Sequence, residues 1–403
     1  MSISQNDHVS RRDFLRTTTC GAAAAGMTMF NPSLLGGPAT QPASQFPKPP
    51  LPYGILGKTK YPATLISLGA ILLAEKLGTR VLKLAIDRGV NLVHTSESYG
   101  GGKSIAAVAD LFKADKRYRD KVFLCLKGRK PEEKDEVDRM LKILGTDHAD
   151  VVLTVLPKPQ ERQLDIVRKQ QDRLLKQGKV RFKGFVCHGD MNGVSEMVLE
   201  KAPDYFDVAL LAMTMAPIPG SKDEDRRGKE SERFVRNLKA LRDKGVGILS
   251  MKSGARKAVQ KGADIFGPHV KAILAAGADA MLTSMDTYQQ VEMACKLDLT
   301  SPHTQAERQA AADFQRSRSD ACLMCGACSR ACPQELPIND LMRFRMYHAE
   351  NGWHEHARAE YAALGVDFRE HAAMCGDCTA CTNACPVGLA SYHTIRETAD
   401  WLA

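Results

Sequence analysis

Two cysteine runs near the C-terminus are the residues of this 403-residue chain that are best suited to chemistry. Each run has the spacing Cys-x2-Cys-x2-Cys-x3-Cys-Pro, and together they supply Cys322, Cys325, Cys328, Cys332, Cys375, Cys378, Cys381 and Cys385. This spacing binds [4Fe–4S] clusters, because three thiolates on one tight loop can reach three irons of one cube. The sequence therefore predicts two clusters, which would carry electrons one at a time.

The two runs also predict which cysteines share a cluster. In two-cluster proteins the fourth cysteine of each run usually binds the other cluster. We therefore assign Cys385 to the cluster held by the first three cysteines of the first run, and Cys332 to the other cluster. A zinc site or disulfides are the alternatives, but zinc sites are more often built from two Cys-x2-Cys pairs.

Length and composition bound the remaining possibilities. A chain of 403 residues suggests more than one domain, and a hydrophobic fraction of 44% is ample for a sizeable core. The net charge is +9, but the basic residues are spread along the chain and only 6% of residues are aromatic. We interpret this charge as solvated surface and expect no nucleic-acid partner.

The pattern of the first 45 residues predicts a targeting segment. The residues around Arg11 and Arg12 resemble the twin-arginine export signal, and a weakly apolar stretch and a proline-rich linker follow. The apolar stretch is too short to span a membrane, so we expect a periplasmic or otherwise exported protein without stable membrane insertion. Twin-arginine export carries folded proteins, as a cluster-containing protein requires. The alternative is a cytoplasmic enzyme with a chance Arg-Arg pair.

Residues 50–300 alternate short apolar runs with helical periods, which predicts a (β/α)8 barrel. A doubly wound sheet is less favoured, because no Gly-x-Gly-x-x-Gly follows the first strand. Barrel chemistry occurs where the strands end, at their carboxyl side. The candidate strands are Ala63–Leu68, Asn91–Thr95, Val122–Leu126, Asp150–Val155, Phe182–Cys187, Phe206–Met213, Gly247–Met251 and Ala278–Thr283.

This segment resembles the aldo/keto reductases. The motif at residues 89–100 is similar to that family's Gly-x-Asn-x-x-Asp-Thr-Ala-x-x-Tyr-Gly signature, and residues 178–184 are similar to its Gly-Lys-Ile-Arg run. Residues 56–59 and 144–150 resemble its opening hairpin and the turn into its fourth strand. The fusion to a two-cluster domain narrows the resemblance to the ferredoxin-linked branch.

The resemblance implies catalytic roles for particular residues. Tyr99 would donate a proton to a substrate carbonyl, and Lys127 would lower the pKa of Tyr99. His94 stands where the family has the Asp that holds the lysine, and Val155 stands where it has the substrate-orienting His. Glu97 is the candidate replacement for the missing carboxylate. Two of four roles are therefore altered.

The resemblance also implies NAD(P)H as a cofactor, but this chain lacks some of the side chains that hold the nicotinamide in that family. Val186 and Ala212 stand at positions where the family binds the carboxamide, and neither can form those hydrogen bonds. A helix N-terminus after the last strand could still receive phosphates. The candidate cofactor-binding residues are Lys252, Ser253, Thr283 and Ser284. His188 resembles a histidine that is common after the fifth strand in the ferredoxin-linked branch.

Residues 304–403 are predicted to form a mainly α-helical, ferredoxin-like two-cluster domain, with helices at 304–319, 338–350 and 354–364. Eight cysteines fill two cubes, so we expect no histidine ligand. The leading hypothesis is an exported oxidoreductase that acts on a small-molecule substrate and exchanges electrons with a redox partner protein. The second is an electron carrier whose barrel is an inactive scaffold.

Overall fold

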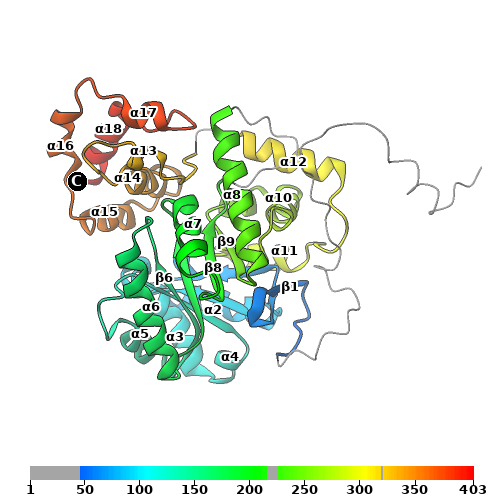
Figure 1. The fold of residues 1–403 in the computed structure, drawn as a ribbon. Coiled ribbons are helices and arrows are strands. Elements are labelled where there is room, and N and C mark those ends of the chain that lie inside the picture. Colours follow the sequence, from blue (N-terminus) through cyan, green and yellow to red (C-terminus); the bar gives the residue numbers. More distant parts are fainter. Residues whose placement is uncertain (1–45, 216–224, 319–320) are drawn as a thin grey trace, which may run out of the picture.

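The computed structural model describes residues 46–215, 225–318 and 321–403, so the predicted export signal lies outside the described residues. Its first domain is a closed barrel of eight parallel strands (Figure 1). Around the barrel the order is β10-β3-β4-β5-β6-β7-β8-β9. The strands are β3 (Ile66–Gly69), β4 (Leu92–Thr95), β5 (Phe123–Gly128), β6 (Ala149–Val155), β7 (Val180–Cys187), β8 (Val208–Ala212), β9 (Gly247–Met251) and β10 (Ala280–Thr283).

Helices cover the outside of the barrel because each has one apolar face. In α6, for example, Leu164, Val167 and Leu174 are buried, while Lys169 and Asp172 are exposed. The helices are α2 (Glu75–Asp87), α3 (Lys103–Ala114), α4 (Arg117–Asp120), α5 (Glu136–Leu144), α6 (Glu161–Lys176), α7 (Met191–Lys201), α8 (Asp225–Asp243), α9 (Ala255–Lys261), α10 (Ala263–Ala275) and α11 (Tyr288–Cys295).

A hairpin of β1 (Tyr53–Leu56) and β2 (Tyr61–Thr64) packs where the barrel strands begin. Gly57 has a φ of 48°, and a Cβ there would lie 2.3 Å from the backbone nitrogen of Gly247, so only glycine fits. The predicted first strand, Ala63–Leu68, was wrong as a single strand. The chain changes partner near Leu65, leaving β2 for the hairpin and β3 for the barrel.

The C-terminal domain contains only helices in its described part. It is reached through α12 (Gln305–Arg316), whose start is fixed by a capping box of Thr304 and Glu307. Its helices pack at the carboxyl end of the barrel strands, beside α7 and α8 (Figure 1). They are α13 (Ala327–Arg330), α14 (Ile338–Arg345), α15 (His354–Ala362), α16 (Phe368–Cys375), α17 (Ala380–Ala384) and α18 (Tyr392–Leu402), with a π-helical turn η5 (Met346–Glu350) after α14.

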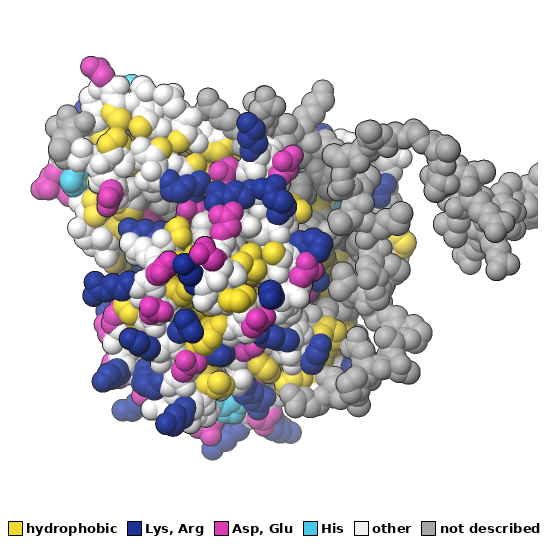
Figure 2. Space-filling view, in the orientation of Figure 1, with side chains coloured by type: hydrophobic (Ala, Val, Ile, Leu, Met, Phe, Trp, Pro, Cys, Tyr) yellow, Lys and Arg dark blue, Asp and Glu magenta, His cyan; other side chains and the backbone are white. Residues whose placement is uncertain are grey.

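Basic and acidic side chains intermingle on the face shown in Figure 2, with apolar side chains scattered between them. Among the described helices, none combines the length and the apolar character that crossing a membrane requires.

Candidate active site and cluster sites

One cavity of about 140 Å³ lies at the carboxyl end of the barrel strands. It brings together the predicted catalytic residues His94, Tyr99 and Lys127, and it also exposes Lys252, Thr283 and Ser284. The other wall comes from the C-terminal domain, which contributes Met346, Tyr347, Asn351, Trp353, His356 and Glu360. The cavity is therefore formed by both domains. Ser253 is buried outside the lining, where its hydroxyl is 3.7 Å from the Met281 sulfur.

Tyr99 and Lys127 lie next to each other in this cavity. Tyr99 begins the short turn η4 (Tyr99–Gly102), in which all three glycines have positive φ and bend the chain sharply into α3. Lys127 is on β5, and its Nζ is 5.5 Å from the centre of the Tyr99 ring. The ring of His94, on β4, is 5.7 Å from that of Tyr99. Tyr99 is only 8% exposed and Lys127 only 7%.

Burial sets the protonation of these groups. It raises the pKa of Tyr99 far above its usual value, so the phenol stays neutral. Burial lowers the pKa of Lys127 to about 8. Burial and the positive charge of Lys127 lower the pKa of His94 to about 3. Lys127 is therefore the group of the three that gains and loses a proton near neutral pH, as a general acid or base should.

The carboxylate influence on Lys127 does not come from Glu97. Glu97 forms an ion pair with Arg139 at 3.5 Å, and no ion pair between Glu97 and Lys127 exists among the described residues. Instead, the charge of Glu360 raises the pKa of Lys127, partly offsetting burial. Glu360 is on α15, 231 residues after Arg129 in the chain, so no local sequence motif could reveal this contact.

Glu360 is held in place by two arginines. It pairs with Arg129, two residues beyond Lys127, and with Arg343 at 3.5 Å. Although burial alone would raise the pKa of Glu360, the charges of Arg129, Lys127 and Arg343 lower it to about 2. The carboxylate is therefore ionised at physiological pH and connects the barrel to the C-terminal domain.

Lys252, another residue of the cavity lining, contacts the C-terminal domain through Tyr347. It follows β9 with a φ of 54°, a conformation that is uncommon for a residue with a side chain. Its ammonium donates a hydrogen bond to the Tyr347 hydroxyl and lies 4.1 Å from the centre of that ring. Burial and then the Arg343 charge lower the pKa of Lys252, while the Cys322 thiol acts in the opposite direction. Lys252 is therefore near both the cavity and the first cysteine run.

The positions that differ from the family pattern lie in hydrocarbon surroundings. Val186 lines the cavity beside Leu210, and Ala212 is fully buried outside the lining. Val155 is partly buried and also lies outside the lining of the cavity.

His188 lines the cavity, is 4% exposed and has no hydrogen-bond partner on either ring nitrogen among the described residues. Burial and nearby cations lower the pKa of His188 well below its usual value.

Three cations near Thr283 and Ser284 were missed by sequence reasoning. Arg256, Lys257 and Arg318 line the same cavity. Arg256 is 3.9 Å from the Asp286 carboxylate, and Arg318 donates a 3.0 Å hydrogen bond to the Ser253 carbonyl. Arg318 follows the linker helix α12, so its arrival at the barrel mouth is a tertiary contact that the spacing of the barrel motifs does not predict.

The first cluster site collects Cys322, Cys325, Cys328 and Cys385 around one small cavity. This is the grouping predicted from the sequence. Burial, followed by the other three thiols, raises the pKa of Cys328, so thiolates here require a positive partner. None of the described cysteines forms a disulfide. Apolar residues complete the lining, among them Leu323, Met342, Val387 and Leu389. These residues fit a [4Fe–4S] cluster.

The predicted second site consists of Cys332, Cys375, Cys378 and Cys381. Burial raises the pKa of Cys375, and the thiols of Cys332, Cys381 and Cys378 add to this effect. These are the four cysteines that the sequence assigns to the second cluster, and their grouping stays a prediction. Cys378 is exposed and the other three are half-buried. These residues also fit a [4Fe–4S] cluster, but one nearer to the solvent.

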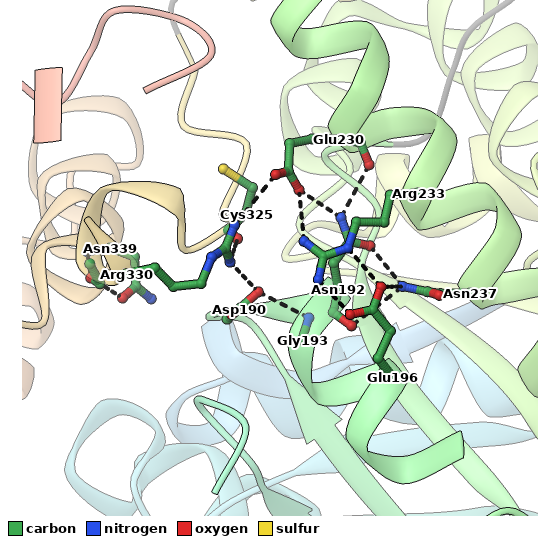
Figure 3. A network of polar contacts seen from close by, with 11 residues as sticks. Asp190, Asn192, Gly193, Glu196, Glu230, Arg233, Asn237, Cys325, Arg330 and Asn339 are labelled. Atoms are coloured by element: carbon green, nitrogen blue, oxygen red, sulfur yellow. Dashed lines mark hydrogen bonds and ion pairs between the residues drawn. The ribbon is translucent and has the colours of Figure 1, made fainter. Parts of the chain in front are cut away.

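A polar network joins the first cysteine loop to the barrel (Figure 3). Arg330 donates a 2.9 Å hydrogen bond to the Cys325 carbonyl and pairs with Asp190, the residue that caps α7, at 2.5 Å. Glu230 of α8 accepts from Arg330 at 3.4 Å. The network continues into α7 and α8 through Asn192, Glu196, Arg233 and Asn237.

Close backbone packing reinforces this junction. A Cβ at Gly326 would lie 2.7 Å from the Asp190 side chain, and one at Gly189 would lie 2.1 Å from the Pro157 carbonyl. Thr214, after β8, donates a hydrogen bond to the Leu323 carbonyl. The first cluster site is therefore fixed against the loops that follow β7 and β8.

Comparisons with known proteins agree with this architecture. Residues 73–266 match the model of the aldo/keto reductase family, and residues 318–389 match that of the 4Fe-4S dicluster domain. The chain thus carries an aldo/keto reductase family domain followed by a C-terminal dicluster domain, which confirms the predicted fold class and supports the prediction of an oxidoreductase. No curated protein matches the chain.

Several solved structures are similar to the barrel. A putative aldo-keto reductase from Pseudomonas aeruginosa is 19% identical, with a TM-score of 0.45, covering 64% of this chain and 95% of that one. An aldo-keto reductase from Bacillus halodurans in its holo form is 16% identical, with a TM-score of 0.49, covering 66% and 96%. An aldo/keto reductase from Klebsiella pneumoniae in complex with NADP and acetate is 16% identical, with a TM-score of 0.48, covering 64% and 94%.

Proposed function

We propose that this oxidoreductase couples the reduction or oxidation of a small molecule in the barrel cavity to single-electron transfer through two [4Fe–4S] clusters. The observation that carries the proposal is the shared cavity. Its walls hold Tyr99 and Lys127 from the barrel and Tyr347 and Glu360 from the dicluster domain. A barrel that served only as a scaffold would not require the cluster domain to complete its catalytic cavity.

The cavity residues are suited to moving protons. Reduction of a carbonyl to an alcohol takes two electrons and two protons, and oxidation of the alcohol returns them. Lys127, with its pKa near 8, would supply one proton through Tyr99 to the substrate oxygen, and solvent would supply the second proton to the carbon; oxidation would reverse both transfers. When bound, each cluster supplies or accepts one electron at a time. Glu360 keeps Lys127 closer to its protonated form than burial alone would allow.

The arrangement of the two cysteine sites supports a direction for the electron route. Lys252 lines the cavity, and the charge of Cys322 affects its pKa, which supports a position of the first site on the cavity side. The second site includes the exposed Cys378. We therefore propose that electrons pass between the cavity and the first site, and that a redox partner protein docks near the second.

NAD(P)H is the two-electron reactant that the aldo/keto reductase domain suggests. The cations Arg256, Lys257 and Arg318 favour bound phosphates. The hydrocarbon wall at Val186 and Leu210 disfavours a nicotinamide, whose carboxamide needs polar partners. The test is anaerobic mixing of the cluster-loaded chain with NADPH and then NADH. Loss of absorbance at about 400 nm, with dithionite as the positive control, would establish nicotinamide as the reactant.

An electron carrier with an inactive barrel is the second candidate, and the hydrocarbon residues Val155 and Val186 favour it. Mutation separates the two functions. If the barrel is catalytic, Tyr99→Phe slows turnover with small carbonyl compounds but leaves reduction of the clusters by dithionite unchanged. If the barrel is a scaffold, Tyr99→Phe changes neither. Asp243→Asn, at an exposed ion pair on α8, is a control outside the cavity.

We also propose that the chain acts outside the cytoplasm, because Arg11 and Arg12 precede a weakly apolar stretch. The test is fractionation of cells that express the full chain or the double substitution of Arg11 and Arg12 by lysine. Loss of the exported pool in the variant is the expected result. An unchanged cytoplasmic location for both would overturn the proposal.

A further inference from the structure

Two lysines of the barrel, the buried Lys127 and the partly buried Lys252, line the cavity together with the carboxylate of Glu360. Glu360 is already paired with Arg129 and Arg343, neither of which lines the cavity. Buried charges require a partner of opposite sign or a costly change of protonation. An anion from outside the chain would supply such a partner for Lys127 and Lys252.

Neither of these two lysines forms an ion pair among the described residues. Lys252 donates its hydrogen bond to the uncharged Tyr347 hydroxyl. Both lysines act on the same histidine, because their charges each help to lower the pKa of His188. The three side chains therefore surround one region of the cavity.

Unpartnered polar atoms face the same cavity. Both ring nitrogens of His188, the hydroxyl of Thr283 and the Nε2 of His94 have no hydrogen-bond partner among the described residues. All three side chains are more than nine-tenths buried. Buried polar atoms without a partner are rare in proteins, so such a group points to a ligand that supplies the missing bonds.

We propose that the cavity binds a small organic carboxylate, with the carboxylate group between Lys127 and Lys252 and within reach of His188. The proposal rests on the proposed function only in taking this anion to be the substrate. The volume of about 140 Å³ is close to the roughly 150 Å³ of a cavity that binds benzene, so a ligand of about six heavy atoms would fit. Val186, Leu210 and Leu282 would contact its carbon skeleton. A phosphate offers no carbon to reduce or oxidise.

The test measures binding alone, by isothermal titration calorimetry of the cluster-loaded full chain under anaerobic conditions without a reductant. The probes are pyruvate, its methyl ester and inorganic phosphate. We expect pyruvate to bind about tenfold or more tightly than the ester, because a charge-assisted hydrogen bond is lost in the ester. Equal binding of ester and acid, or binding of phosphate alone, would overturn the proposal.

Variants locate the site. Lys252→Met should weaken pyruvate binding about tenfold or more, whereas Lys252→Arg should retain most of it. Lys169→Met removes the same charge from the exposed face of α6 and should leave binding unchanged. Iron content and circular dichroism verify that each variant is folded. Equal affinity in Lys252→Met and Lys169→Met would refute the site. Binding without any cluster oxidation or turnover would instead refute the proposed function and leave the anion site standing.

Discussion

The two cluster sites use the same cysteine spacing in different surroundings. The first has Cys325 and Cys328 buried, and its loop is tied to the barrel through Arg330 and Thr214. The second has Cys378 exposed and its other cysteines half-buried. In the electron route that we propose, the first site would exchange electrons with the cavity and the second with an external partner. The surroundings of the motif, and not its spacing, are the basis for these two roles.

The largest expected effect comes from removing one cluster at a time. Cys325→Ala should lose about four of the eight irons and all electron exchange with the cavity. Cys378→Ala should lose the same amount of iron but keep exchange between the cavity and the remaining cluster, while losing transfer to an external acceptor. Iron analysis and anaerobic spectrophotometry check both. Identical electron transfer in the two variants would contradict the claim that the two cluster sites have different roles.

Lys127 should affect only the cavity side of the route. Lys127→Met removes the group that titrates near neutral pH, and we expect turnover to fall by about 10²–10⁴-fold. Dithionite should reduce the clusters of this variant as it does those of the unaltered chain. Steady-state rates compared with dithionite reduction measure the difference. Loss of both activities would mean that Lys127 supports the fold and not the reaction.

Arg330 tests the attachment of the first site. Arg330→Ala leaves the buried Asp190 carboxylate without its charged partner, which should cost about 1–3 kcal/mol of unfolding free energy. Arg345→Ala is the matched control, since Arg345 pairs with Glu397 within the dicluster domain. Anaerobic denaturant titration compares them. Equal losses in the two variants would show that the contact with the barrel adds nothing specific.

The smallest expected effect is a shift in pH dependence. Carbonyl reduction should decline as pH rises through about 8, because Lys127 then loses the proton that it donates. Glu360 raises the pKa of Lys127, so Glu360→Gln should move this decline to lower pH. Lys127→Arg should be about as slow as Lys127→Met and show no decline near pH 8, because arginine stays protonated and donates no proton. Rate–pH profiles of the three proteins decide this, and an unmoved profile in Glu360→Gln would exclude the influence of α15.

Local patterns explain what could be predicted from the sequence. Cysteine spacing is fixed within single loops, and barrel strands repeat with a regular period, so the fold class and the 4Fe-4S dicluster domain could be predicted, with eight cysteines as candidate ligands. Tyr99 and Lys127 could be found because each lies in or beside a strand end with a recognisable motif. The break near Leu65 was missed, because one continuous apolar run serves both β2 and β3.

The far wall of the cavity could not be predicted. Tyr347, Trp353, His356 and Glu360 lie in or beside helices whose periodic pattern shows that one face is buried, but not what covers it. The π-helical turn that carries Tyr347 breaks the regular helical period as well. The sequence suggested Glu97 as the carboxylate near Lys127, but Glu97 pairs with Arg139. The carboxylate that affects the pKa of Lys127 is Glu360, which comes from the C-terminal domain.

One measurement tests the central claim that cavity chemistry and cluster electrons are coupled. The full chain is reduced with dithionite, freed of the excess and mixed anaerobically with pyruvate, while the absorbance at about 400 nm is followed. The account predicts that one pyruvate reoxidises both clusters with the formation of lactate. The reaction should be slowed about 10²-fold or more in Lys127→Met but not in Lys169→Met. Clusters that stay reduced, or that reoxidise equally fast in Lys127→Met, would contradict the account.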